Sequence, residues 1–211
     1  AIGGHAEIER LVARSEGFGR YCDALSNRAG QTFDATIAKD LWLRVGRIAE
    51  ENLKDDRRAV EAYAKAVEQA GDEPALLEAL DRLYSRIGDN KALADVLERR
   101  VAVISNEAEQ AGFYHRLAMI QIEAFGDKSA GLATLKQALE RAPNHTASRE
   151  ALEKLTDEQS LFEEAAEALE NVYKSQADYA ALAKLYEKRI KFAGTATERV
   201  RMRLDLAKVL E

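Results

Sequence analysis

The sequence predicts an all-α fold, and three observations carry this prediction. The 211-residue chain has only 2 prolines against 12 glycines, and it is rich in Ala, Leu, Glu, Arg and Lys, which favour helices. It lacks the alternating runs of Val, Ile, Thr and aromatic residues that a half-buried sheet needs. Its apolar residues recur instead at helical spacing, in segments separated by short breaks.

About twelve helices follow from this apolar spacing and from the helix breakers between the segments. The expected spans are 6–16, 18–29, 34–52, 56–70, 74–87, 90–104, 107–125, 128–141, 145–157, 160–174, 178–192 and 196–211. The breaks are short and carry turn chemistry, as in Gly-Asp-Asn from residue 88 and Gly-Asp-Lys from residue 126. Helices with such short connections run antiparallel to their neighbours, so we expect helix hairpins.

The chain also repeats itself. Residues 78–101 align with residues 6–29 at a shift of 72 residues, and residues 77–101 align without a gap with residues 166–190 at a shift of 89. The second shift is longer by 17 residues, about one helix and a loop, so we interpret the helix at 145–157 as an insertion. We therefore expect a single right-handed α-solenoid over residues 1–211, with super-repeats at about 6–77, 78–149 and, in part, 166–211.

Two hairpins carry a recognisable order of large and small residues. In the first hairpin the order is Trp42, Val45, Gly46, Ala49, Ala59, Tyr63 and Ala66, and in the second it is Tyr114, Leu117, Ala118, Gln121, Gly131, Leu135, Ala138 and Pro143. The helix at 196–211 repeats the first half as Arg203, Leu206, Ala207 and Leu210. This spacing resembles the tetratricopeptide repeat (TPR) family, as a bacterial-type array with irregular units. Asp81 and Glu170 depart from the pattern, because the family prefers a small residue at their positions.

Small residues on one helix face allow two antiparallel helices to approach closely. We expect Gly46, Ala59 and Ala66 at one such contact. Ala118, Gly131 and Ala138 are expected at the next contact. The helix at 196–211 has no partner hairpin after it, so we expect the chain to be a fragment of a longer array, or this helix to cap the array or to dock elsewhere.

Composition limits the partners and the compartment. The net charge is −6 with no block of Lys or Arg, which argues against nucleic-acid binding. No apolar run approaches the ~20 residues that cross a bilayer, so we expect no membrane insertion. The single cysteine, Cys22, excludes an intrachain disulfide and suits a reducing compartment. We expect a cytoplasmic location, with the periplasm as the alternative that stays open.

Little in the sequence points to catalysis, a metal or a cofactor. His5, His115 and His145 lie far apart and there is no cysteine pair, so a zinc site is not expected. Cys22 could meet His115 in space, but its neighbours Tyr21 and Leu25 favour a packed thiol over a nucleophile. We expect Trp42 in the core. The chain is therefore not predicted to be an enzyme, and no cofactor is expected.

The resemblance implies a place for a binding surface. In the family, the first helix of each hairpin lines a concave groove, and the residue after the apolar–small pair faces into it. The residues at these positions are Arg10, Arg47, Arg82, Met119, Lys154 and Lys208, with Asn171 in the doubled hairpin. Such a row of cations suits an acidic partner segment. The alternative is that these charges pair with Glu50, Glu78, Glu123, Glu150 and Glu167 and recognise no ligand.

The leading hypothesis is a non-enzymatic scaffold that binds a protein or peptide segment in this groove. The expected contact residues are Arg10, Arg47, Arg82, His115, Met119 and Lys154. The family's Lys and Asn clamp for chaperone tails is absent, because its positions hold pairs such as Leu43 with Arg47 and His115 with Met119. The alternative hypothesis is a structural spacer or self-association module of a larger protein.

Overall fold

The computed structural model describes residues 17–210, and over this range the chain is all-α, without a strand. The expected helix at 6–16 lies outside the described residues. The chain forms two compact units, Ala1–Val103 and Ile104–Glu211. The continuation of these units as one solenoid stays a prediction.

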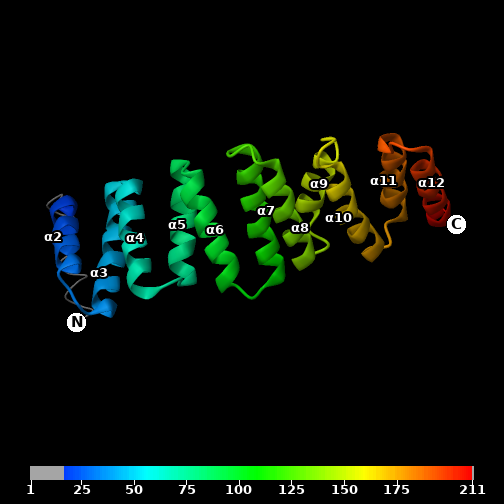
Figure 1. The fold of residues 1–211 in the computed structure, drawn as a ribbon. Coiled ribbons are helices and arrows are strands. Elements are labelled where there is room, and N and C mark those ends of the chain that lie inside the picture. Colours follow the sequence, from blue (N-terminus) through cyan, green and yellow to red (C-terminus); the bar gives the residue numbers. More distant parts are fainter. Residues whose placement is uncertain (1–16, 211) are drawn as a thin grey trace. The chain divides into compact units, whose positions relative to one another are not determined.

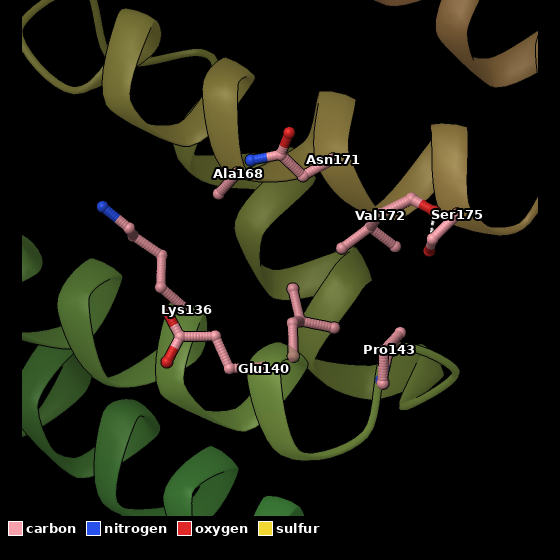
Figure 2. A pocket seen from close by; sticks show the side chains of 8 residues that line it. Lys136, Glu140, Pro143, Ala168, Asn171, Val172 and Ser175 are labelled. Carbon is pink, nitrogen blue, oxygen red and sulfur yellow. Dashed lines mark hydrogen bonds between the residues drawn. The ribbon is translucent and has the colours of Figure 1, made fainter.

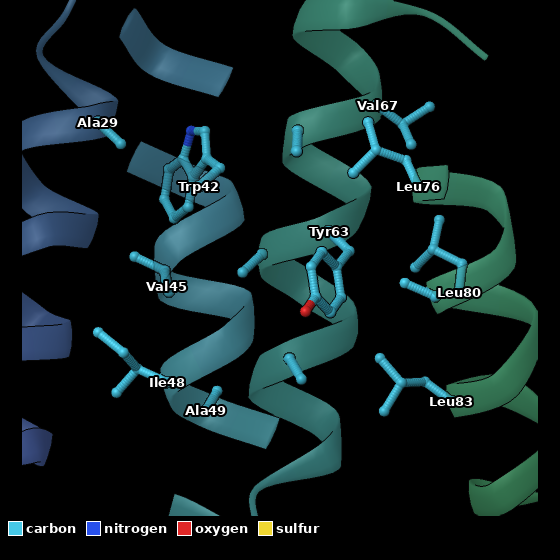
Figure 3. Close-up of a cluster of buried hydrophobic side chains, with 14 of the residues drawn as sticks. Ala29, Trp42, Val45, Ile48, Ala49, Tyr63, Val67, Leu76, Leu80 and Leu83 are labelled. Carbon is cyan, nitrogen blue, oxygen red and sulfur yellow. The ribbon is translucent and has the colours of Figure 1, made fainter. Parts of the chain in front are cut away.

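The described part of the first unit contains five α-helices and one π-helical turn. They are α2 (Phe18–Gly30), α3 (Ala35–Ile48), η1 (Ala49–Leu53), α4 (Asp56–Ala70), α5 (Pro74–Ile87) and α6 (Asn90–Val103). Each of these α-helices packs on the next one along the chain, as neighbouring ribbons within the unit (Figure 1). Trp42, Val45, Tyr63, Leu80 and Leu83 contribute to its core, in which Trp42 is buried as expected (Figure 3).

Over residues 104–210, the described part of the second unit contains six helices. They are α7 (Glu107–Glu123), α8 (Lys128–Arg141), α9 (Thr146–Leu155), α10 (Phe162–Ser175), α11 (Tyr179–Phe192) and α12 (Ala196–Leu210). Neighbours along the chain again pack on one another (Figure 1). The ten-residue helix α9 also contacts α7, and it stands between α8 and α10, which touch each other only slightly.

One kind of turn closes four hairpins. In each turn a residue with positive φ precedes an aspartate whose side chain accepts the backbone N–H three residues later, which caps the second helix. The four pairs are Lys54–Asp55, Gly88–Asp89, Gly126–Asp127 and Ala177–Asp178, with φ of 53°, 75°, 71° and 53° and cap distances of 3.0, 3.0, 2.8 and 3.0 Å. Lys54 and Gly126 stand 72 residues apart, and Gly88 and Ala177 stand 89 apart, so the backbone repeats at both shifts of the sequence.

Close approach of small residues holds the hairpins α3/α4 and α7/α8 together. A Cβ atom on Gly46 would lie 2.7 Å from the ring of Tyr63, and one on Gly131 would lie 3.1 Å from the carbonyl oxygen of Ala118. Ala138 is fully buried on α8 and packs in a cluster with Tyr114 of α7. A larger side chain at either glycine would therefore push the two helices apart.

Ion pairs take the place of small residues in the hairpins α5/α6 and α10/α11. Asp81 is 3% exposed and pairs with Arg100 in the hairpin α5/α6. In the hairpin α10/α11, Glu170 pairs with Arg189. Glu170 stands 89 residues after Asp81, and Arg189 stands 89 residues after Arg100. Glu170 also accepts hydrogen bonds from Tyr186 at 2.8 Å and Lys174 at 2.5 Å. Burial alone would raise the pKa of the Glu170 carboxyl, but these three donors outweigh burial and hold the pKa below its ordinary value. The departure of Asp81 and Glu170 from the family pattern therefore has a structural role.

The turn at Ala177 gives a direct test of this backbone geometry. Ala177→Gly is expected to stabilise the protein by about 1 kcal/mol, because an alanine side chain is strained at positive φ and glycine is not. Gly88→Ala, at the matching turn, should destabilise it by a similar amount. Urea unfolding measures both, as shifts of the midpoint with an unchanged slope. Equal effects of the same sign would contradict the shared turn geometry.

Candidate functional site

The structure describes five of the six residues predicted to contact a partner. Arg10 lies outside the described residues. Arg47 is exposed on α3 and has no ion pair with any residue of 17–210. In the second unit, His115 and Met119 are half-buried on α7, and Lys154 is exposed on α9.

Arg82 makes the internal ion pair that the sequence allowed as an alternative. Its guanidinium donates to both oxygens of Glu50, with Nη2 2.8 Å from Oε2 and 3.0 Å from Oε1. Arg86 adds a hydrogen bond of 2.7 Å to Glu50 and an ion pair of 2.9 Å to Asp56. These groups line a polar hollow of about 470 Å³. Burial would raise the pKa of Glu50, but the two arginines outweigh it and lower the pKa, so Glu50 stays ionised and competes with any ligand for Arg82.

His115 and His145 are distant in the sequence but meet in the second unit, around Ser148. Their ring centroids are 5.5 Å apart, and the buried Ser148 places its Oγ 2.8 Å from His145 Nδ1 and 3.3 Å from His115 Nδ1. His145 also caps α9, because its Nδ1 accepts the backbone N–H of Ser148. Burial lowers the pKa of both imidazoles, and the charge of His145 lowers that of His115 further. His115 therefore connects α7 to α9 through its contacts with Ser148 and His145.

Met119 also has a packing role. Its side chain is partly buried and packs against the apolar core of the second unit, which includes Leu132, Leu152 and Leu169. A flexible thioether of this kind fills irregular gaps in a core. Of the two predicted contact residues on α7, neither is fully exposed.

Lys154 lies in a hollow of the second unit. This lysine cleft, of about 660 Å³, is formed by α9, α10, α11 and the loops beside them. Its lining residues are Glu150, Glu153, Lys154, Thr156, Asp157, Leu169, Tyr173, Asp178, Ala180, Ala181, Lys184, Leu185 and Lys188. Lys184 and Lys188 were not predicted from the sequence, because they stand on the second helix of their hairpin, whereas the resemblance directs attention to first helices.

A smaller apolar cleft lies on the other side of α10. It has a volume of about 240 Å³ and is lined by Lys136, Leu139, Glu140, Pro143, Ala168, Asn171, Val172 and Ser175. Figure 2 shows Lys136 and Glu140 on α8 facing Ala168 and Asn171 on α10, with Pro143 at one end. The cleft lies between α8 and α10, and the short inserted helix α9 packs on both of them.

Cys22 is fully buried, and its thiol donates to the carbonyl oxygen of Val45 at 3.8 Å. Burial is the main cause that raises its pKa, so it stays a protonated thiol rather than a nucleophilic thiolate. Within residues 17–210 no three His, Cys, Asp or Glu side chains gather as metal ligands would. No helix in the described part of the chain has the length and apolar character to cross a membrane.

The hairpins of each unit, their small-residue contacts and their repeated turns resemble those of tetratricopeptide repeats. Solved structures with a similar fold include MamA, with 14% identity and a TM-score of 0.46 over 81% of this chain and 95% of MamA. They also include YrrB, described as a TPR protein with an unusual peptide-binding site, at 16% identity and a TM-score of 0.39 over 88% and 97%. A third is TTC0263 of Thermus thermophilus, described as a thermophilic TPR protein, at 18% identity and a TM-score of 0.35 over 82% and 98%. No protein-family model and no curated protein matches the chain.

Protonation of His145 is expected to weaken the cap of α9. Because the folded-state pKa of His145 is lowered, the neutral imidazole stabilises the fold above about pH 6.5, and this stability falls as the pH drops below that value. Loss of the cap costs about 1 kcal/mol. His145→Asn keeps a neutral cap, so its free energy of unfolding should fall less between pH 7 and pH 5 than that of the wild type. Parallel pH profiles from chemical denaturation would show that the cap does not titrate.

Proposed function

We propose that this chain is a non-enzymatic scaffold that binds a segment of a protein partner on the first helices of its hairpins. The proposal rests on a difference between two sets of charged groups: one set makes contacts within the protein, and the other is exposed without an ion pair. Groups with shifted pKa values, such as Glu50, Glu170 and His145, make contacts within or between helices. Arg47 and Lys154 are exposed and have no ion pair within the described part of the chain.

The finer form of the proposal is that the partner segment is acidic and lies in a concave groove. The contact residues would be Arg10, Arg47, Arg82, His115, Met119 and Lys154. Exposed cations that are not paired within the protein are available to partner carboxylates, and they mainly set orientation and association rate. Apolar contacts would supply most of the affinity. Arg82 contributes only if the partner displaces Glu50, so Arg47 and Lys154 should contribute more.

A peptide array screened with the isolated chain tests this proposal. The double variant Arg47→Glu, Arg82→Glu should weaken a captured peptide by roughly tenfold, about 1.4 kcal/mol. The matched control is Arg57→Glu with Arg141→Glu, which reverses the charge of two exposed arginines on second helices. Its affinity for the peptide should stay within about threefold of the wild type. Circular dichroism establishes that both proteins are folded. If Arg47→Glu with Arg82→Glu leaves the affinity unchanged, the partner segment does not bind in the proposed groove.

Helix α12 favours a second candidate function, as a structural or self-association module. It exposes Val200 and Leu204 to 56% and 59%, and these residues stand one turn apart on the same face. An exposed apolar face of this kind suits a contact with another copy of the chain.

Light scattering after size-exclusion chromatography separates the two functions. If α12 mediates self-association, the mass should rise with concentration, and Val200→Lys with Leu204→Lys should return it to that of a monomer. A monomer at every concentration up to about 1 mM would exclude self-association, since a weak association gives a Kd in that range.

A further inference from the structure

We infer that the lysine cleft is a binding site for an acidic peptide segment, with Lys154 and Lys184 as the two residues that recognise its carboxylates. This inference rests on the proposed scaffold function and gives it a place in the second unit. The cleft has a volume of about 660 Å³, which lies within the usual range of ligand sites.

The inserted helix makes this cleft possible. Lys154 belongs to α9, and the 17 extra residues that include α9 have no counterpart between α4 and α5. Without α9 the cleft would lose the wall that carries Lys154 and Thr156. The site is therefore a local feature of the second unit and not a property of every hairpin.

Most carboxylates that line the cleft are already engaged. Glu153 accepts a hydrogen bond of 2.6 Å from the hydroxyl of Tyr173 and lies 3.5 Å from the guanidinium of Arg149. Asp157 accepts from Lys188 at 2.6 Å, and Asp178 caps α11. Glu153 and Asp157 each have a cation beside them, and the N-terminus of α11 stabilises the charge of Asp178, so these acids repel an incoming carboxylate less than free carboxylates would.

The cations that remain available are two lysines. Lys188 is held by Thr156 and Asp157, each at 2.6 Å, whereas Lys154 and Lys184 are exposed and form no ion pair with residues 17–210. Glu150 stands one turn before Lys154 without reaching ion-pair distance. An exposed pair of this kind is too weak to withhold Lys154 from a ligand. The cleft therefore offers two lysines without an ion pair against Glu150 and Asp178, and the charge of Asp178 is stabilised by the N-terminus of α11.

The floor of the cleft adds a second requirement for the ligand. Leu169 and Leu185, which are buried, and Ala181, which is half-buried, form this apolar floor. An apolar side chain on this floor would leave flanking carboxylates within reach of the lysines. The ligand class is therefore a peptide in which acidic and apolar residues alternate. An oligonucleotide is disfavoured, because the net charge of the chain is −6 and two lysines do not form a phosphate-binding track.

The test uses a fluorescein-labelled peptide of alternating glutamate and leucine, and a matched peptide of alternating glutamine and leucine. Fluorescence anisotropy with the full chain should detect the first peptide and at least tenfold weaker binding of the second. Lys154→Glu with Lys184→Glu should weaken the glutamate peptide at least tenfold. The matched control, Lys91→Glu with Lys191→Glu, reverses two exposed lysines outside the cleft and should change binding by less than threefold. The affinity should also fall as salt is raised, because exposed charges are screened.

Several outcomes would overturn the inference. They are equal losses in the two double variants, equal binding of the two peptides, no binding of the glutamate peptide, or tighter binding of a single-stranded oligonucleotide of similar length. If array peptides still bind while the change at Lys154 and Lys184 has no effect, the scaffold function survives and only the cleft is wrong. If the array captures no peptide at all, the scaffold function itself fails.

Discussion

A capped, left-handed turn is the constraint on which the other features of this fold depend. In four hairpins an aspartate caps the second helix directly after a residue that reverses the chain at positive φ, as Gly126 does before Asp127. The same geometry recurs before Asp55, Asp89 and Asp178. Because the turn fixes which faces of the two helices meet, it determines where small residues, ion pairs and exposed side chains must stand.

Two solutions fill the space between helices that such a turn brings together. Gly46 and Gly131 allow direct approach of the helices, whereas the buried Asp81 and the half-buried Glu170 each form an ion pair with the opposite helix. A buried ion pair costs desolvation and is a weak source of stability, but it penalises any pairing that leaves its charges alone. Alternation of the two solutions gives adjacent hairpins different interfaces, and it explains why the sequence repeats over about 72 residues rather than over one hairpin.

Most of the fold could be predicted from the sequence, because helix spacing, Gly-Asp turns and small residues are local signals. The expected span 128–141 coincides with α8, and the small residues Gly46 and Gly131 stand at helix contacts as predicted. The candidate site was harder to predict. Nothing in the spacing of His115 and His145 signals their contact, which depends on how the inserted α9 packs on α7. Lys184 could not be predicted as a contact residue, because its proposed role depends on three helices that surround one hollow.

The turns also bear on how the chain folds. The extensive helix contacts of both units join neighbours along the chain, so each hairpin can form over a short loop without waiting for distant segments. Glycine reaches positive φ without strain, whereas Lys54 and Ala177 adopt it at a cost in free energy. We therefore expect the hairpins closed by Gly88 and Gly126 to serve as folding nuclei, with those closed by Lys54 and Ala177 added afterwards. The order of assembly would then be set by which residue occupies a single left-handed position.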